Sequence, residues 1–235
     1  MDEFDLSGDH NQTAWSLTTD TVEFTAYGAG SPKPRIYKPG LSDLTFSMAG
    51  YWDAASGGDE PDNVYFGNIA AQGVLTFSAE GGDDGETAYS MRSVEASYNP
   101  REGSVGEAHS FNVDGKAKGQ WLGGTIMHNA TRTASGNGTA RQLGSVAAGE
   151  YVYAALHVVT VSGTAPTLDV KVQSDSASGF ASPTDQITFT QATAGTSEWG
   201  TRVAGAITDD WWRVNYTIAG SSPSFLFIVT IGIGI

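Results

Sequence analysis

The chain has 235 residues, no cysteine and a formal net charge of −14 at pH 7. The missing cysteine excludes disulfides and thiolate chemistry, and so acidic a surface repels nucleic acid and anionic membrane headgroups. The acidic opening MDEFDLSGDH is unlike a secretory signal. No apolar run reaches the roughly 18 residues that a membrane-spanning helix needs, so we expect no membrane partner.

The first predicted strand covers residues 43–49, within the segment KPGLSDLTFSMAGYWDAA (38–55). We interpret Pro39-Gly40 as the turn that precedes it. Apolar and small polar residues then alternate with period two, which is typical of a strand with one buried face. The apolar face would hold Leu44, Phe46 and Met48, and the other face Thr45, Ser47 and Ala49.

One helix is predicted, over residues 60–72. Asp59 would be its N-cap, Pro61 would lie in its first turn, and Gly73 would end it. A long acidic loop is expected next, over 79–87. Oxygen-rich loops can bind Ca²⁺, but neither this loop nor GGDEPDN has the ligand ladder of a calcium loop. We favour a solvated loop tip over a calcium site.

The rest of the chain predicts strands and turns. Alternating segments such as TLDVKVQS and WWRVNYTI are separated by turn signals about every ten residues, which is typical of a sandwich or barrel. The polar, turn-rich segment 128–142 predicts a linker or a long loop. We therefore expect an all-β fold with a β domain over 1–127 and a second β-sandwich half over 143–235. That half could equally be an outer domain or part of one enlarged fold.

No arrangement of residues predicts catalysis, a metal site or a cofactor. The four histidines stand alone, and no nucleophile-elbow, zincin or P-loop motif occurs. An acidic glycosidase is disfavoured because no carboxylate pair is held on a rigid element. A sugar-binding platform of Trp199, Trp211 or Trp212 remains an alternative, although adjacent tryptophans on a strand face opposite ways, so one of Trp211 and Trp212 should lie in the core.

Residues 4–126 resemble the tail tube (major tail) proteins of long-tailed bacteriophages. The likeness rests on the order of short motifs: "D-x-S-G", "TAYG", "PGL-x-D" leading to a strand that ends in "GYWD", and "G-x-V-G-E" followed by a strand. In this sequence these are Asp5, Ser7 and Gly8; Thr25 and Gly28; Pro39, Gly40, Leu41 and Asp43; Gly50, Tyr51, Trp52 and Asp53; and Gly103, Val105, Gly106, Glu107 and Phe111.

The resemblance implies a structural, non-enzymatic virion protein with a tail-tube-type β-sandwich. Its sheets would join those of neighbouring copies into a barrel-like ring, either a hexamer or a trimer, and rings would stack head-to-tail. DNA would pass through the lumen without specific binding. Tail terminator, tape measure and baseplate proteins would be the other partners. The protein would be assembled in the host cytoplasm and reside in the virion tail.

Site residues follow from that expectation. Thr45, Ser47 and Ala49 would face the lumen, and ring stacking would involve Phe4, Leu6, Trp15, Asp83, Asp84 and Glu86. The acidity of residues 1–120, which hold 19 acidic and 7 basic residues, suits a channel that does not retain DNA. Another virion β-protein, such as a capsid decoration or tail terminator subunit, is the first alternative, and a carbohydrate-binding β-sandwich is the second.

Overall fold

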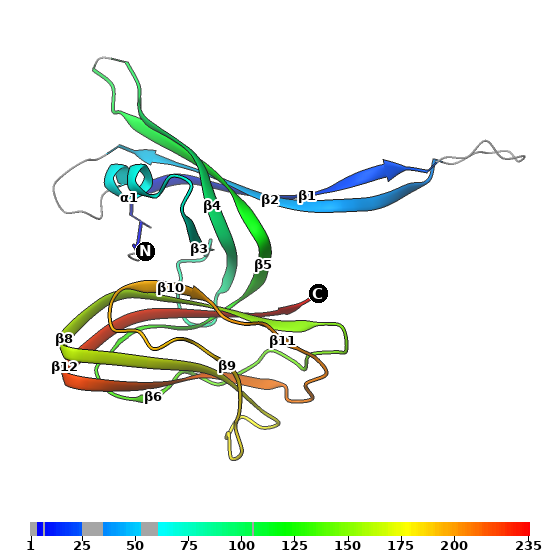
Figure 1. Cartoon of the computed structure of the whole chain (residues 1–235), viewed down its shortest axis with the longest axis vertical. Helices are drawn as coiled ribbons and strands as arrows, with labels where there is room; N and C mark the ends of the chain where they lie inside the picture. Colours follow the sequence, from blue (N-terminus) through cyan, green and yellow to red (C-terminus); the bar gives the residue numbers. More distant parts are fainter. Residues whose placement is uncertain (1–3, 7, 25–34, 53–60, 105) are drawn as a thin grey trace, which may run out of the picture. The chain divides into compact units, whose positions relative to one another are not determined.

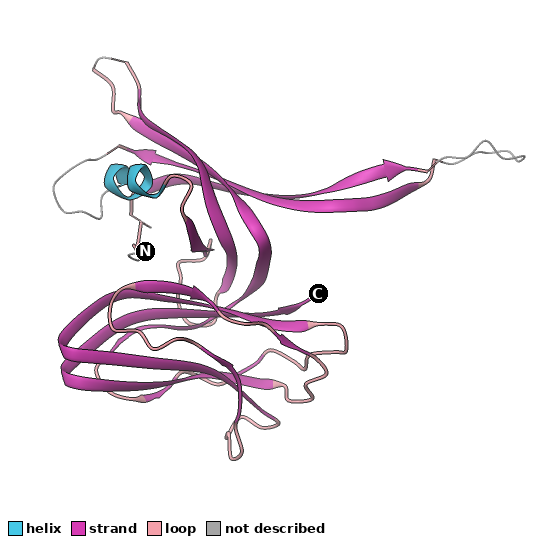
Figure 2. Ribbon diagram, viewed as in Figure 1, coloured by secondary structure: helices cyan, strands magenta, loops and turns pink. Residues whose placement is uncertain are grey.

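The structure, a computed structural model, describes residues 4–6, 8–24, 35–52, 61–104 and 106–235. These residues are mostly in strands, with one short helix among them (Figure 2). The expected all-β fold is therefore confirmed. In chain order the elements are β1 (His10–Glu23), β2 (Tyr37–Tyr51), α1 (Pro61–Asn68), β3 (Gln72–Phe77), β4 (Thr87–Glu102), β5 (Ser110–Arg132), β6 (Gly136–Asn137), β7 (Arg141–Gln142), β8 (Tyr151–Asp175), β9 (Thr184–Thr188), β10 (Thr196–Trp199), β11 (Val203–Ala204) and β12 (Trp211–Gly234).

The chain divides into two compact units. The ribbon unit comprises Leu6–Ala71 and Val94–Ala117, and the sandwich unit comprises the first five residues, Gln72–Ser93 and Lys118–Ile235. The segment 128–142, expected as a linker or long loop, lies inside the sandwich unit, where it forms the end of β5 and the short strands β6 and β7. The chain is thus not divided at that segment.

The ribbon unit is built on the antiparallel pair β1–β2, whose register runs from His10 opposite Gly50 to Glu23 opposite Tyr37. The second half of β2 also pairs with the start of β5, so this part of the sheet has a strand on both sides. The alternating burial predicted for 43–49 is confirmed. The buried side of this sheet holds Leu44, Phe46, Met48, Phe111 and Val113.

The expected Pro39-Gly40 turn is wrong, because both residues lie inside β2. Proline lacks an amide proton and is tolerated in a strand only at an edge or a bulge. Pro39 lies opposite Thr21, directly beside a bulge in which Gly40 and Leu41 of β2 lie against the single residue Asp20 of β1. A Cβ atom at Gly40 would be 3.1 Å from the Cβ of Asp20, so the glycine allows the two strands to approach closely.

The helix is shorter than the predicted 60–72, and the expected stop at Gly73 lies in β3 instead. Its end is set by Ala70, whose φ of 62° is left-handed and cannot continue a helix. The side-chain amide of Asn68 donates to the carbonyl of Val64 at 2.6 Å and so helps to satisfy the last turn. The expected N-cap, Asp59, lies outside the described residues.

In the sandwich unit, β8 and β12 pair with each other along almost their whole length, from Trp211 opposite Asp175 to Gly234 opposite Tyr151. The pair bends back on itself (Figure 1), so its two halves pack face to face. The shorter strands β6, β7, β9, β10 and β11 pair along it. Residues from both halves form one core that includes Leu156, Val158, Leu168, Val170, Trp212, Val214, Phe227 and Val229.

Two glycines build the bend. Gly163 and Gly220 have φ angles of 115° and 121°, which side chains rarely adopt. Each is pressed against the opposite strand: a Cβ at Gly163 would be 2.8 Å from the carbonyl oxygen of Ser222, and one at Gly220 would be 2.8 Å from that of Ala165. The bend therefore depends on the absence of side chains at these positions.

A buried hydrogen-bonded chain fastens β3 and β4 to β8 and β12 within the sandwich unit. The hydroxyl of Thr76 is 2.7 Å from Nε2 of His157 and 2.7 Å from the hydroxyl of Ser90. Ser90 in turn is 2.9 Å from the hydroxyl of Thr230. His157, Ser90 and Thr230 are all buried. A search of the described residues finds no helix with the length and apolar character needed to cross a membrane.

Candidate self-association surface

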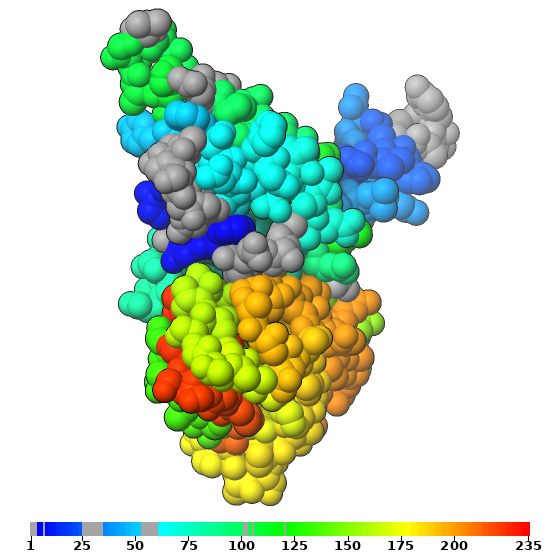
Figure 3. Space-filling view, turned by 60° about the vertical axis from the view of Figure 1, so that its left-hand side comes forward, coloured from blue at the N-terminus to red at the C-terminus, as the bar shows by residue number. Residues whose placement is uncertain are grey.

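The outer part of the β1–β2 pair, residues 17–24 and 35–43, is here called the distal ribbon. Its two strands pair with each other, and in the described chain neither has a further strand beside it, because β5 pairs with β2 only from Thr45 to Tyr51. Figure 3 shows this ribbon, in blue, as a projection whose side chains are open to solvent. A two-stranded ribbon alone is at best marginally stable in water.

One face of the distal ribbon is apolar at its outer end. Val22 lies opposite Lys38 in the register. The amide of Phe24 donates to the carbonyl of Ile36 at 2.7 Å, so this pair extends the ladder. Val22, Phe24 and Ile36 share this face and are 49%, 54% and 53% exposed, whereas Leu17 lies on the other face, opposite Leu44. An apolar stripe that remains half open to water marks an interaction site.

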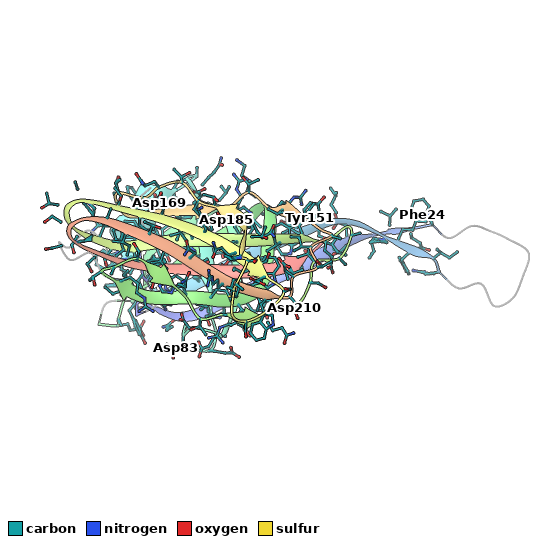
Figure 4. The ribbon with its side chains drawn as sticks, turned by 90° about the horizontal axis from the view of Figure 1, so that it is seen from below. Phe24, Asp83, Tyr151, Asp169, Asp185 and Asp210 are labelled. Atoms are coloured by element: carbon teal, nitrogen blue, oxygen red, sulfur yellow. The ribbon has the colours of Figure 1, made fainter. Side chains whose placement is uncertain are left out.

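Phe24 lies at the far end of the described ribbon (Figure 4). The Nζ of Lys38 lies 4.8 Å above its ring, a cation–π contact. Near the same end the guanidinium of Arg35 is 3.7 Å from the carboxylate of Glu23, and both side chains are exposed. The end of the ribbon thus combines exposed apolar groups with paired charges, which suits docking against a folded protein surface.

The face of the β2 sheet opposite its buried side is small and polar beside residues 45–49. Thr45, Ser47 and Ala49, the predicted lumen residues, are half-buried there. In the register they lie beside Ser16, Ala14 and Gln12 of β1 and beside Lys116, Asp114 and Asn112 of β5. This face carries Asp43 and Lys116 as an exposed ion pair at 3.1 Å. Beside residues 45–49 the described part of this face holds no large apolar side chain, whereas farther along the ribbon the same face holds Val22, Phe24 and Ile36.

The start of β1 is fastened to α1 through His10. Its Nδ1 is 2.7 Å from the carbonyl of Leu6, and its Nε2 is 2.7 Å from the hydroxyl of Tyr65. Since a carbonyl only accepts, Nδ1 carries the proton and Tyr65 donates to Nε2. Burial lowers the pKa of His10, partly offset by its bond to Leu6 and by the charge of Asp9. The neutral imidazole thus links the segment before β1 to the helix.

A second polar group holds α1 against the sheet. Oδ1 of Asp62 accepts from the indole of Trp52 at 3.0 Å and from the hydroxyl of Tyr98 at 2.8 Å. Glu95 has a buried carboxylate oxygen, Oε1, with no hydrogen-bond partner, and burial raises the pKa of this carboxyl to about 7. These contacts position the ribbon on a rigid base.

Carboxylates of the acidic loop between β3 and β4 accept hydrogen bonds from backbone amides and so stabilise the loop. Oε2 of Glu86 accepts from the backbone amides of Gly82 and Asp83 at 2.6 and 2.9 Å. Oδ1 of Asp84 accepts from the backbone amide of Asn129 at 2.5 Å. Asp83 is exposed, and Figure 4 shows it at the edge of the molecule. No group of three or more metal-ligating side chains occurs in the part of the chain that the structure describes.

The other predicted stacking residues are divided between the two units. Phe4 belongs to the sandwich unit with the acidic loop, whereas Leu6 and Trp15 belong to the ribbon unit. All three are half-buried. Trp15 lies opposite Phe46, on the buried side of the β1–β2 pair, and thus not on the face of Val22 and Phe24.

The three tryptophans do not share a platform. Trp212 is fully buried in the sandwich core, and its indole donates to the carbonyl of Gly144 at 2.8 Å. Trp199 lies opposite Ala155, on the outer side of one half of β8, and Trp211 lies opposite Asp175, on the outer side of the other half. Because the two halves pack face to face, Trp199 and Trp211 lie on opposite sides of the sandwich. The prediction that one of the adjacent pair is a core residue is confirmed.

The apolar face of the distal ribbon was not predicted from the sequence. In TTDTVEF only Val22 and Phe24 alternate, and the bulge at Gly40 and Leu41 in β2 decides which residues of β2 lie opposite them. A signal was nevertheless present, since the segment from position 24 to position 42 holds Phe24 and Ile36 but no acidic residue.

Three comparisons with known proteins were made. No protein-family model and no curated protein matches the chain. Similar solved structures include the virion and the tail of a gene transfer agent particle, the tail having C6 symmetry. They have 15% and 16% identity, a TM-score of 0.38 each, and cover 51% of this chain and 90% of theirs. Another is the Dit protein of phage SPP1, a hub of its adsorption apparatus, with 11% identity, a TM-score of 0.32, and coverage of 98% and 96%. These identities and TM-scores are too low to support a functional assignment. The proposed function therefore rests on the residues and geometry of the chain itself.

Proposed function

We propose that the chain is a non-enzymatic structural subunit of a virion, a tail tube protein that assembles with copies of itself through the distal ribbon. The observation that carries this proposal is the half-exposed apolar stripe of Val22, Phe24 and Ile36, on a ribbon beside which the described residues place no further strand. The motif order over residues 4–126 supports the choice of a tail tube among virion proteins.

The unpaired edges favour a partner that supplies strands. β1 is 14 residues long, and among the described residues only β2 pairs with it, so its other edge has no strand beside it. Such an edge is a template for pairing with another chain. A ring of identical copies removes every edge when the last copy pairs with the first. The proposed ring is a hexamer, with a trimer as the alternative, and rings stack head-to-tail.

Burial of the apolar stripe supplies the energy for docking. About half of each of the three side chains is open to water, so covering the remainder contributes about 1 kcal/mol for each residue. Three such contributions of about 1 kcal/mol are modest for one contact, but they repeat around a ring. A weak single contact also keeps the free subunit soluble until an assembly site is available.

The polar face of β2 is the proposed lumen wall. Thr45, Ser47 and Ala49 present hydroxyls and a methyl group, and the neighbouring charges Asp43 and Lys116 neutralise each other. A wall of this kind offers DNA phosphates no cluster of cations to bind. Genomic DNA would therefore pass without being retained, and tail terminator, tape measure and baseplate proteins would be the other partners.

The test is assembly of the purified chain, followed by sedimentation velocity and negative-stain microscopy over a concentration series. We expect uniform rings or tubes from the wild type and monomers from the double variant Val22→Ser/Ile36→Ser. Tyr37→Ser is the matched control, because Tyr37 is 52% exposed but lies opposite Glu23, on the other face of the ribbon. Wild-type protein that stays monomeric at every concentration, or a Tyr37→Ser variant as defective as the double variant, would contradict the proposal.

A further inference from the structure

His128 lies inside the core of the sandwich unit without any hydrogen-bond partner. The residue is completely buried, and neither ring nitrogen has a hydrogen-bond partner. Its ring stacks on Phe227 with centroids 4.3 Å apart, and it lies 5.2 Å from the ring of Tyr216. These aromatic neighbours come from the two halves of β12, so the imidazole fills the space between the two layers.

The surroundings of His128 offer an added proton no acceptor. Val229 lies opposite it on β12, and the Cβ position of Gly138 in the β6–β7 loop is 3.5 Å from Nδ1. The ionisable groups near it are Asp84 in the acidic loop, Arg132 on β5 and Tyr216 on β12. Asp84 is already engaged with the amide of Asn129 and, through its carbonyl, with Arg141.

We propose that His128 makes the sandwich unit acid-sensitive: its protonation forces the core open between β5 and β12. An imidazolium without a partner cannot remain in an apolar core, so it must reach water or be expelled. The register shift between Val229 and Thr230 lies directly opposite this histidine, and it is a discontinuity in the β5–β12 ladder at which the strands can separate. This inference does not depend on the proposed function, since it concerns a single copy of the chain.

The direction of the pH dependence follows from the protonation equilibrium. Burial lowers the pKa of His128 from 6.5 to about 4; the charge of Asp84 partly offsets this effect and that of Arg132 adds to it. His128 of the unfolded chain is therefore protonated below pH 6.5, whereas His128 of the folded unit is protonated only below about pH 4. Stability is lost as the pH falls through this window and is fully present above it.

The difference between the pKa of His128 in the unfolded and in the folded state sets the size of the stability loss. A shift of this magnitude raises the unfolding equilibrium constant of the sandwich unit about 20-fold at pH 5 and over 100-fold at pH 4, relative to neutral pH. Carboxylates add their own acid dependence, so the contribution of His128 must be isolated by comparison with a variant. His128→Phe keeps an aromatic ring for the stack and removes the titration.

The experiment is urea unfolding of the full chain at several pH values between 7.5 and 4, together with proton NMR of the histidine ring signals. We expect the ratio of wild-type to His128→Phe unfolding constants to rise about 20-fold between pH 7 and pH 5. His109→Gln is the control and should leave the wild-type profile unchanged. If His128→Phe fails to fold, the wild-type NMR titration decides: a His128 signal that titrates between pH 6 and 7 overturns the proposal, as does a ratio that is independent of pH.

Discussion

The polar chain from Thr76 to Thr230 yields a sharp prediction for Thr230→Val. Valine has nearly the shape of threonine but lacks the hydroxyl that lies 2.9 Å from Ser90. Ser90 keeps its bond to Thr76, so no buried hydroxyl loses every partner. The net loss of one hydrogen bond is about 1 kcal/mol, and the buried polar surroundings raise the cost to about 1–2 kcal/mol. For a unit of this size that corresponds to a fall in Tm of about 3–6 °C.

The assay is differential scanning calorimetry of the full chain, in which the transition of the sandwich unit is followed. Thr217→Val is the matched control, because Thr217 lies on the same strand and is exposed. The control should change stability by less than about 0.5 kcal/mol. If both variants behave alike, the chain of hydroxyls contributes nothing, and the attachment of β3 and β4 rests on other contacts.

Three further predictions follow from local geometry. Gly220→Ala should destabilise the sandwich unit by about 2 kcal/mol or more in urea unfolding, because its φ is 121° and its Cβ would lie 2.8 Å from the carbonyl oxygen of Ala165. Gly234→Ala, with open space around it, should be neutral. Equal effects of the two variants would contradict this account of the bend. Tyr65→Phe should cost the ribbon unit about 1 kcal/mol and speed amide hydrogen exchange around Asp9 and His10, because His10 loses its donor; unchanged exchange rates would contradict it. Lys171→Met should raise the pKa of Asp185 in a carboxyl NMR titration, because Lys171 is the main cause of its lowered value. The variant should change stability by less than about 1 kcal/mol, since the ion pair is exposed. An unchanged pKa of Asp185 would show that the hydrogen bond from Gln173 alone lowers it.

The period-two alternation of apolar residues predicted which side chains of a single strand are buried. The burial of Leu44, Phe46 and Met48 and the opposite orientation of Trp211 and Trp212 follow directly from strand geometry. The sequence could not predict where the helix ends, because a left-handed alanine at position 70 has no sequence signal. Pro39-Gly40 resembles a turn, and only the pairing with β1 shows that it lies within a strand.

The candidate surface was harder to predict than the fold. Its residues come from two strands, and the bulge in β2 decides that Lys38 and Ile36 lie opposite Val22 and Phe24. Pairing register is a property of the folded pair, so a pattern within one strand does not reveal it. The acidic loop shows the same limit, since Asp84 accepts from the backbone amide of Asn129, which is 45 residues away in the sequence.

The most direct test of the account is a cryo-electron microscopy map of the assembled chain, with the contacts of β1 traced in it. The account predicts that the free edge of β1 pairs with a strand of a neighbouring copy, with Val22 and Phe24 buried between copies and Thr45 and Ser47 facing a channel. A map in which the distal ribbon projects into solvent while other surfaces hold the copies together would contradict it.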